Sequence, residues 1–360
     1  MKISILGAGN AGTAVAGHLS LIGHEVTLIK TSNSMHNENF EYLLKNDGKI
    51  IFEENNKLTE TKIHRVTKEL EELSSSEIVI IYIQTKYHEQ LIEKASKYFN
   101  KNQIVIINPG YLSTAYMLKY CNNNLPIVVE AESSFIDCRI KEPGVIKVGF
   151  RNVRNPLGVF PCNKTDFVKN KLEKLGFPFS YVSTIEAALH NPNMIVHTVG
   201  AVMSIPRIEK TNGDYCMYHE VFTPSVWNIL EKLDSEKMDI IEKLGFERLS
   251  YVEACKYRNS LDDTRDAKEV FFWYAAMPTR AKGPTKVDSR YISEDVPEGL
   301  VMLETLGEQL KIKTPICTSL IEMASAALGR DLRSEGRSIS RLGKDNIQKI
   351  LKDSKQYERK

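Results

Sequence analysis

The sequence predicts an α/β fold, with an N-terminal doubly wound parallel sheet followed by an all-helical C-terminal domain. The chain begins with a short apolar strand, a glycine-rich loop and a helix. Apolar runs of strand length recur as far as residue 182, whereas beyond residue 184 apolar residues recur only at helical spacing. A chain of 360 residues suits two domains, and we expect them to span residues 1–183 and 184–360.

The composition excludes several classes of protein. The chain has 42% hydrophobic and 26% charged residues, which is typical of a globular protein. Its 48 basic residues nearly balance its 46 acidic ones, and the resulting net charge of +2 is too small to draw it to nucleic acid or to an anionic membrane. No apolar run reaches the roughly 20 residues of a membrane helix, and no signal peptide is recognisable. We therefore expect a cytoplasmic protein that acts on small molecules.

The six cysteines are scattered, without a CxxC pair and without a Cys/His cluster of zinc-ligand spacing. Scattered thiols are typical of a reducing compartment. The sequence thus predicts neither disulfides nor a metal site.

The first motif is a glycine loop between a strand at residues 3–6 and a helix at residues 10–21. In this G-x-G-x-x-G pattern, Gly7 permits the tight turn, Gly9 lets the backbone approach a pyrophosphate, and Gly12 allows the helix to pack on the sheet. The helix N-terminus offers N–H groups to the phosphates. This context predicts a Rossmann-type dinucleotide site. The residues expected to contact the dinucleotide are Gly7, Gly9, Asn10, Ala11 and Gly12.

The end of the second strand, residues 25–30, indicates which nicotinamide is bound. NAD-binding sites usually have a carboxylate there for the ribose 2′-OH. This chain has Lys30 and Thr31 instead, a cation and a hydroxyl that suit a 2′-phosphate. The pattern favours NADP (NADPH), with NAD as the alternative cofactor; in that alternative, Lys30 is only a solvated lysine at a strand end.

Two further apolar runs, residues 77–82 and 103–107, predict central strands of the sheet. Gln84 and Thr85 follow the first run, and Asn108 of an Asn-Pro-Gly turn follows the second. Ligands of open α/β sheets bind at such strand ends, so we expect these residues to border the cofactor; ordinary turn chemistry is the alternative. The remaining expected elements are helices at 87–98, 114–121 and 167–175, and strands at 125–130, 144–148, 158–160 and 179–182.

The second half predicts helices at residues 185–202, 226–244, 300–310 and 315–328. The polar region 256–290 is expected to form loops that border a cleft. An exposed apolar face on the last of these helices would permit a homodimer.

Histidine is the natural general acid/base near neutral pH. Two histidines, His190 and His197, lie close together at the start of the helical half, and the chemistry of the residues alone leaves either as a candidate. His219, next to Glu220, is a weaker candidate.

Over almost its whole length the sequence resembles the opine dehydrogenase family, which includes octopine and nopaline dehydrogenases. The most specific segment is Arg290-Tyr-Ile-Ser-Glu-Asp-Val-Pro-Glu-Gly-Leu300, and Asn191-Pro-Asn-Met-Ile-Val-His197 resembles the segment that carries the family's catalytic histidine. Two departures are Thr198 where the family usually has proline, and Tyr111-Leu-Ser where a glycine pair often follows the Asn-Pro-Gly turn.

The resemblance implies His197 as the acid/base residue, Asp295 as its partner, and Arg290 and Asn193 as substrate-binding residues. It also implies an NAD(P)-dependent oxidoreductase that condenses an α-keto acid with the amino group of an amino acid and reduces the C=N bond. One alternative is a 2-keto acid reductase resembling ketopantoate reductases, which typically use a catalytic lysine. The other is a non-catalytic NADP-binding regulatory protein, which the joint presence of His197, Asp295 and Arg290 disfavours.

Overall fold

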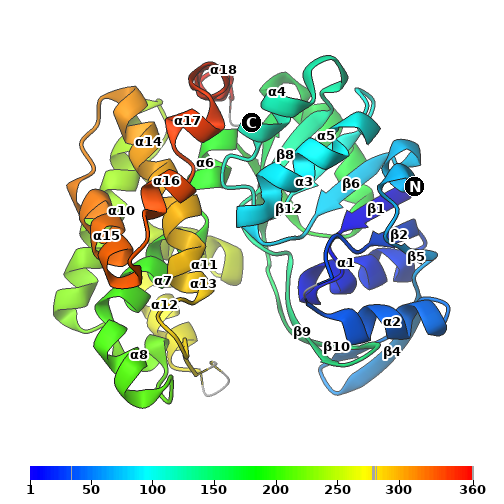
Figure 1. Cartoon of the computed structure of the whole chain (residues 1–360), viewed down its shortest axis with the longest axis horizontal. Coiled ribbons are helices and arrows are strands. Elements are labelled where there is room, and N and C mark those ends of the chain that lie inside the picture. Colours follow the sequence, from blue (N-terminus) through cyan, green and yellow to red (C-terminus); the bar gives the residue numbers. More distant parts are fainter. Residues whose placement is uncertain (34, 278–279, 281, 359–360) are drawn as a thin grey trace. The chain divides into compact units, whose positions relative to one another are not determined.

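The computed structural model describes residues 1–33, 35–277, 280 and 282–358, and the chain forms two compact units (Figure 1). The first unit contains Met1–Ala187 together with the described residues from Gln356 onward, and the second contains Ala188–Lys355. The division therefore falls slightly beyond the expected boundary. The last residues belong to the first unit, where the Tyr357 hydroxyl donates to the Tyr181 carbonyl at 2.8 Å.

The first unit is built on an eight-stranded sheet in the order β12-β11-β8-β7-β6-β1-β2-β5. Its neighbouring strands run parallel, except β8 and β11, which are antiparallel. The central strands β6 and β7 are buried along their whole length, as their continuous apolar sequences predict. The strands are β1 (Lys2–Leu6), β2 (Glu25–Ile29), β5 (Arg65–Thr67), β6 (Ile78–Ile81), β7 (Ile104–Ile107), β8 (Ile127–Ala131), β11 (Asn155–Phe160) and β12 (Phe179–Val182).

Helices connect these strands in the alternation that the sequence predicts. The helices of the first unit are α1 (Asn10–Leu21), α2 (Asn37–Lys45), α3 (His88–Ala95), α4 (Thr114–Tyr120) and α5 (Thr165–Leu172); α6 (Thr184–Leu189) begins in this unit. The expected N-terminal Rossmann-type sheet is confirmed.

The sequence prediction did not include a second sheet, which has four strands in the order β4-β3-β10-β9. The strands are β3 (Lys49–Glu54), β4 (Lys57–Lys62), β9 (Ile136–Glu142) and β10 (Val145–Arg151). The strand expected near residues 144–148 thus belongs to this second sheet. Helix α1 packs against strands of both sheets, and the Asn10 side-chain oxygen accepts from the Ile140 backbone N–H at 2.8 Å.

The second unit is helical, as expected. The predicted helix at residues 185–202 is divided in two, because Pro192 begins a new helix for which the Asn191 side chain is the N-cap, accepting from the Asn193 N–H at 2.9 Å. The helices are α7 (Pro192–Met203), α8 (Ile205–Thr211), α9 (Met217–Glu220), α10 (Pro224–Lys243), α11 (Tyr251–Asn259), α12 (Ala267–Ala275), α13 (Arg290–Ser293), α14 (Val301–Leu310), α15 (Pro315–Leu328), α16 (Leu332–Glu335), α17 (Ile339–Leu342) and α18 (Lys344–Ser354).

The expectation of loops over residues 256–290 was wrong in part. Helix α11 begins at a capping box, in which Ser250 and Glu253 each accept from the other's backbone N–H. Helix α12 begins where the Asp266 side chain accepts from the Glu269 N–H at 2.9 Å. These two caps initiate helices in a region whose polar composition predicted loops.

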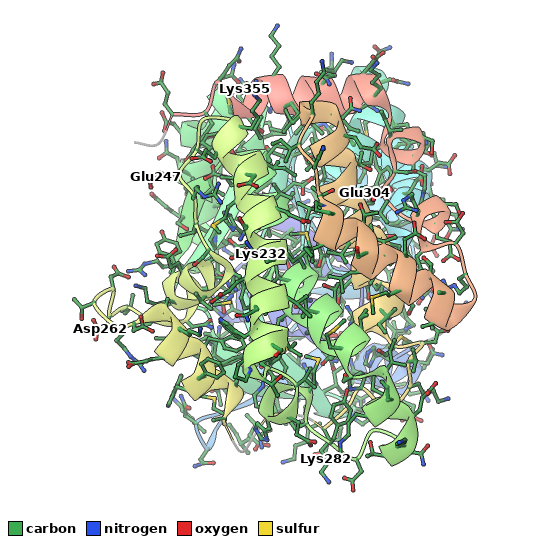
Figure 2. All side chains as sticks on the ribbon, turned by 90° about the vertical axis from the view of Figure 1, so that its left-hand side faces the viewer. Lys232, Glu247, Asp262, Lys282, Glu304 and Lys355 are labelled. Atoms are coloured by element: carbon green, nitrogen blue, oxygen red, sulfur yellow. The ribbon has the colours of Figure 1, made fainter. Side chains whose placement is uncertain are left out.

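The apolar face of α15 is buried within the helical unit. Cys317, Leu320, Ile321 and Ala324 lie on it, and the helix packs on α10 and α14. Figure 2 looks onto this unit, with Lys232 on α10 and Glu304 on α14. The opposite side of α15 exposes Met323, Ala326 and Ala327, and the homodimer stays a prediction. None of the described helices is long and apolar enough to cross a membrane.

Candidate functional site

The glycine loop of the first unit leaves no room for side chains at two of its three glycines. Gly7 has a φ of +113°, and a Cβ there would lie 2.0 Å from the Tyr82 carbonyl oxygen. A Cβ on Gly12 would lie 1.8 Å from the Gly7 carbonyl oxygen. Both glycines are thus required by the fold itself.

Gly9 differs, because a Cβ there would meet only the His36 ring, at 3.6 Å. Gly9 is the N-cap of α1 and makes no side-chain capping bond, so the N-cap residue leaves the first N–H groups of the helix uncapped. An open backbone surface at a helix N-terminus fits the pyrophosphate of a dinucleotide.

Lys30 directly follows β2, but it is not the solvated lysine of the alternative interpretation. Its side chain is 6% exposed, and its Nζ donates to the Met35 carbonyl at 2.5 Å. Burial, and then the charge of Lys68, lower the pKa of Lys30. Both ammonium groups lie 5.6 Å from the centroid of the Phe40 ring. Two cations thus lie around one phenyl ring at the end of β2, while the charge of Glu41 acts on Lys30 in the opposite direction to that of Lys68. Lys68 is a residue that the sequence reasoning missed.

The other strand-end residues of the first unit take part in local contacts. The Gln84 amide lies 3.7 Å from the Met35 sulfur, Thr85 is buried in a 3₁₀ turn, Thr85–Tyr87, and Thr31 follows Lys30 just beyond β2. The Asn108 amide donates to the Tyr82 hydroxyl at 3.0 Å, and burial holds the pKa of that hydroxyl well above its usual value.

The segment after the Asn-Pro-Gly turn keeps a backbone shape that normally favours glycine. Tyr111 and Leu112 have φ angles of 48° and 65°, a left-handed conformation that costs roughly 1–2 kcal/mol for each residue. The buried carboxylate of Glu130, at the end of β8, accepts from the N–H groups of Leu112 (2.8 Å) and Thr114 (2.7 Å) and from the Thr114 hydroxyl (2.8 Å). These charge-assisted bonds offset the strain, which explains how Tyr111-Leu112 can stand where a glycine pair is usual.

In the helical unit, His197 and Asp295 are in direct contact. The ring Nδ1 of His197, on α7, lies 2.9 Å from Oδ2 of Asp295. Asp295 lies two residues after the end of α13. Asp295 is buried, and burial raises its pKa, although the hydrogen bond from His197 acts in the opposite direction. A carboxylate on Nδ1 fixes the tautomer that leaves Nε2 for a reacting group, and it stabilises an imidazolium.

The His197 ring is held on its flat side as well as at its edge. Tyr291 stacks on it with ring centroids 3.8 Å apart and an interplanar angle of 13°. Tyr291 lies within α13, so one short segment supplies both the stacking ring and the carboxylate.

The backbone directly after Asp295 is a π-helix, Val296–Leu300, a geometry that is frequent at functional sites. Within it, Glu298 accepts from Nε of the fully buried Arg337 at 2.6 Å. The Arg337 N–H also donates to the Pro297 carbonyl at 3.0 Å. Arg337 therefore fixes the π-helix, and through it the position of Asp295.

The two predicted substrate-binding residues flank this pair. Arg290 opens α13, its side chain is 64% exposed, and its Nε donates to the buried Glu294 carboxylate. Its charge also acts on Asp295. Asn193 lies on α7, one turn before His197 and on the same side of the helix. The other two histidine candidates lie elsewhere: His190 is buried between α6 and α7, and His219 lies on α9.

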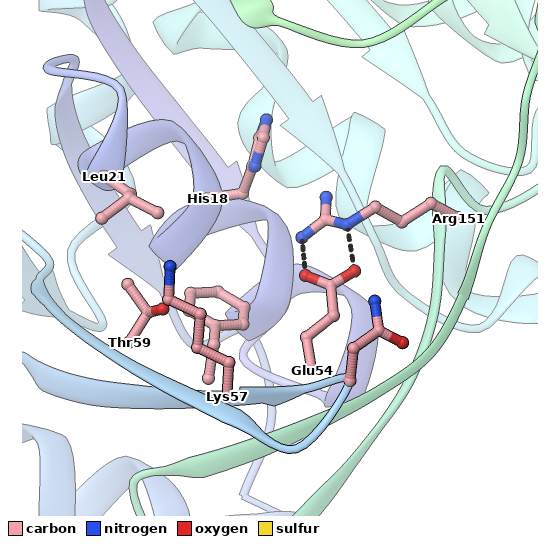
Figure 3. A pocket seen from close by; sticks show the side chains of 8 residues that line it. His18, Leu21, Glu54, Lys57, Thr59 and Arg151 are labelled. Atoms are coloured by element: carbon pink, nitrogen blue, oxygen red, sulfur yellow. Dashed lines mark hydrogen bonds and ion pairs between the residues drawn. The ribbon is translucent and has the colours of Figure 1, made fainter.

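The first unit also contains a cavity of about 350 Å³ toward the C-terminal end of α1 (Figure 3). Arg151 and Glu54 form a two-bond ion pair at its wall, at 2.7 and 3.0 Å. His18 lies beside them, and burial, followed by the charge of Arg151, lowers its pKa to about 4. This cavity is at the opposite end of α1 from the glycine loop. Within the described residues, no group of three or more His, Cys, Asp or Glu side chains forms a metal site.

In a comparison with known proteins, each half of the chain matches a different family model. Residues 181–328 match the family "NAD/NADP octopine/nopaline dehydrogenase, alpha-helical domain", and residues 3–152 match "Ketopantoate reductase PanE/ApbA". The opine dehydrogenase of Arthrobacter sp. (strain 1C) is 26% identical over 351 residues, which cover 94% of each chain. The vitopine synthase of Allorhizobium ampelinum is 24% identical and covers 97% of this chain and 98% of its own.

Along nearly its whole length the chain is thus similar to opine dehydrogenases, and its helical half matches their family model. It is accordingly an NAD(P)-dependent oxidoreductase. The structure of an octopine dehydrogenase in complex with NADH and agmatine has the same fold, with a TM-score of 0.77, 17% identity and coverage of 100% of this chain and 99% of that one. A yersinopine dehydrogenase with NADP+ bound has a TM-score of 0.71, 15% identity and coverage of 99% and 98%.

Proposed function

We propose that this opine dehydrogenase uses NADPH to reduce the C=N bond formed between an α-keto acid and the amino group of an amino acid. The 2.9 Å contact between His197 and the buried Asp295 carries the proposal, because this reaction needs a group that can both give and take a proton near pH 7. When bound, NADPH would supply the hydride that reduces the imine carbon.

His197 moves the protons in this reaction. Condensation of the amine with the keto group releases water, and protonated Nε2 of His197 gives its proton to the departing oxygen. The Asp295 carboxylate, fixed on Nδ1, stabilises the imidazolium form that makes this transfer favourable. The balance is one keto acid, one amine, one hydride and one proton in, and one secondary amine and one water out.

Arg290 and Asn193 hold the substrates against His197. A guanidinium binds a carboxylate through two parallel hydrogen bonds, and the exposed side chain of Arg290 is within electrostatic range of Asp295. Arg290 would exchange its bond to Glu294 for the carboxylate of the keto acid. Asn193, one turn before His197, offers an amide to the same substrate.

The preference for NADPH rests on the end of β2. Lys30 and Lys68 place two positive charges around Phe40, and the 2′-phosphate of NADPH is the group that distinguishes it from NADH. The remaining dinucleotide contacts would come from the glycine loop (Gly7, Gly9, Asn10, Ala11 and Gly12) and from Thr31, Gln84, Thr85 and Asn108.

A 2-keto acid reductase remains the second candidate, because the first unit matches ketopantoate reductase. Such enzymes typically use a lysine of the helical domain. Helix α7 (PNMIVHTVGAVM) has no lysine, and the buried Lys237 of α10 pairs with Asp234 at 2.6 Å. These observations favour the opine reaction.

Product analysis distinguishes the two reactions. The protein would be incubated with NADPH and a panel of keto acids, each with and without a panel of amino acids, and NADPH loss and product mass would be recorded. We expect NADPH loss that depends on the amine and yields a secondary amine. Equal loss without any amine, with a hydroxy acid as product, would instead identify a keto acid reductase.

His197→Asn is the matching test of the acid/base residue. We expect turnover to fall by roughly 100-fold or more, while NADPH binding, measured by fluorescence, stays unchanged because the variant residue lies in the other unit. Near-normal turnover in a folded His197 variant would contradict the assignment.

A further inference from the structure

Besides Arg290, the helical unit contains an arginine, Arg280, whose guanidinium group packs against two tyrosine rings. The Arg280 guanidinium carbon is 4.0 Å from the ring centroid of Tyr218 and 4.1 Å from that of Tyr274. The two rings are nearly perpendicular, at 86°, with centroids 6.4 Å apart. Cation–π contacts with two rings at once fix the position of the guanidinium.

A third arginine, Arg258, interacts electrostatically with Tyr274 from a buried position. Arg258 is buried, and its Nη1 and Nη2 donate to the His190 carbonyl at 3.3 Å and to the Cys255 sulfur at 3.0 Å. Burial lowers its pKa to about 10, and an electrostatic interaction with Tyr274 acts in the opposite direction. Tyr274 is therefore in contact with the Arg280 guanidinium and within electrostatic range of the Arg258 guanidinium, and two positive charges in one region attract an anion.

The helices that carry these residues pack on the helix of the acid/base residue. Tyr218 lies on α9 and Arg258 on α11, and both helices contact α7, which carries His197. The cluster formed by Arg280, Tyr218, Tyr274 and Arg258 therefore belongs to the same part of the helical unit as His197.

An apolar pocket adjoins the cluster at Tyr218. It has a volume of about 260 Å³ and is lined by Tyr218, His219, Phe222, Phe272, Ala275 and Ala276. Whole small-molecule sites usually measure about 300–1,000 Å³, so this pocket suits one side chain rather than a whole substrate. Its lining is mainly aromatic and aliphatic, which favours an apolar occupant.

We infer that Arg280 binds the α-carboxylate of the amine donor, with the buried charge of Arg258 adding to the attraction, and that the pocket beside Tyr218 receives the donor's side chain, so that the preferred donor is an apolar amino acid. This inference rests on the proposed function, in which the product carries two carboxylates and Arg290 binds the one that comes from the keto acid. A second carboxylate then needs a second cationic site, and the arginine pair supplies it.

The carboxylate site is tested with a matched pair of donors, leucine and 3-methylbutylamine, which differ only in the carboxylate. With pyruvate and NADPH, we expect the intact enzyme to favour leucine about 100-fold in kcat/KM, as two charge-assisted hydrogen bonds would give. In Arg280→Met the ratio of the two kcat/KM values should fall to near 1, while KM for pyruvate stays unchanged. Arg280→Lys, which keeps the charge without the planar fork, should give an intermediate ratio.

Arg265→Met is the control. Arg265 also lies over an aromatic ring, that of Trp273 at 5.7 Å, but outside the cluster, so the donor ratio should not change. The pocket is tested separately by Ala276→Leu, which should lower kcat/KM for leucine about tenfold relative to glycine. Circular dichroism and NADPH binding verify that each variant is folded. If Arg280→Met does not fold, Tyr274→Leu replaces it. This variant removes one of the two rings that hold Arg280 and should still reduce the ratio of kcat/KM for leucine to that for 3-methylbutylamine.

The outcomes separate this inference from the proposed function. If the intact enzyme forms no secondary amine with any donor, the proposed function fails. If it forms secondary amines but folded Arg280→Met keeps the donor ratio, or raises KM for pyruvate instead, the inference about Arg280 is overturned while the proposed function stands.

Discussion

The substitution Asp295→Asn should lower kcat by about 1,000-fold without weakening the fold. Asparagine keeps the shape of the side chain that lies 2.9 Å from Nδ1 of His197, but it removes the charge that stabilises the imidazolium. The loss corresponds to about 4 kcal/mol of transition-state stabilisation, at about 1.36 kcal/mol for each factor of ten.

The effect on stability has the opposite sign, because burial raises the pKa of Asp295. A carboxyl group whose pKa is higher in the folded state than in the unfolded state favours folding only as the pH falls through the folded-state pKa. At neutral pH its charge opposes folding. Asparagine removes that cost, so the melting temperature of Asp295→Asn should be unchanged or higher at pH 7, and its stability should depend less on pH.

Asp234→Asn is the matched control, because Asp234 is also buried and also pairs with a cation, Lys237, at 2.6 Å. Removing this carboxylate leaves the Lys237 charge buried, which costs about 3–5 kcal/mol. For a unit of this size the melting temperature should fall by roughly 6–20 °C. Below that transition kcat should be unchanged.

The assay measures kcat by NADPH loss at saturating substrates, together with melting by circular dichroism, for both variants at pH 7. The reasoning is refuted if Asp295→Asn melts as early as Asp234→Asn and loses activity only in proportion to its unfolded fraction, since Asp295 would then act on the fold and not on the proton.

Three further predictions concern the first unit. Gly9→Ala should keep the melting temperature but weaken NADPH binding at least tenfold. Gly12→Ala should instead destabilise the fold, because its Cβ would lie 1.8 Å from a carbonyl oxygen. Calorimetry with and without NADPH measures both effects, and equal melting temperatures of the two variants would contradict this prediction. Lys68→Ala should raise KM for NADPH about tenfold with KM for NADH unchanged, and parallel changes in the two KM values would exclude a contact with the 2′-phosphate. Because burial lowers the pKa of His18 to about 4, the neutral ring stabilises the fold above pH 6.5, and this stability is lost as the pH falls toward 4; urea unfolding at pH 7 and pH 5 should show a smaller difference in His18→Phe, and an unchanged difference would assign the acid sensitivity elsewhere.

Much of the first unit could be predicted from the sequence, because the central strands of the eight-stranded sheet are buried on both faces. Its central strands are continuous apolar runs, such as residues 78–81 and 104–107, and such runs have few other interpretations. The four-stranded sheet was missed because its strands carry many charged residues, as in KLTETK of β4. Alternation between two half-exposed faces gives a weaker signal than continuous burial.

The site was only partly predictable. The pairing of His197 with Asp295, 98 residues away, came from a family resemblance, since neither sequence spacing nor residue type links the two. The role of Tyr291 could have been suspected because it lies, like Arg290, in the segment that most specifically resembles the family. The positions of Arg280 and Lys68 depend on contacts between separate segments, and no local sequence pattern predicts these contacts.

The Glu130 carboxylate that supports Tyr111 and Leu112 has a consequence for how this enzyme can diverge. Residues with side chains occupy the left-handed positions only while the carboxylate accepts from the N–H groups of Leu112 and Thr114. A lineage that lost Glu130 first would therefore lose the bonds and keep the strain. Replacement of residues 111 and 112 by glycine would have to come before any exchange at residue 130, so these three positions should change in that order among related enzymes.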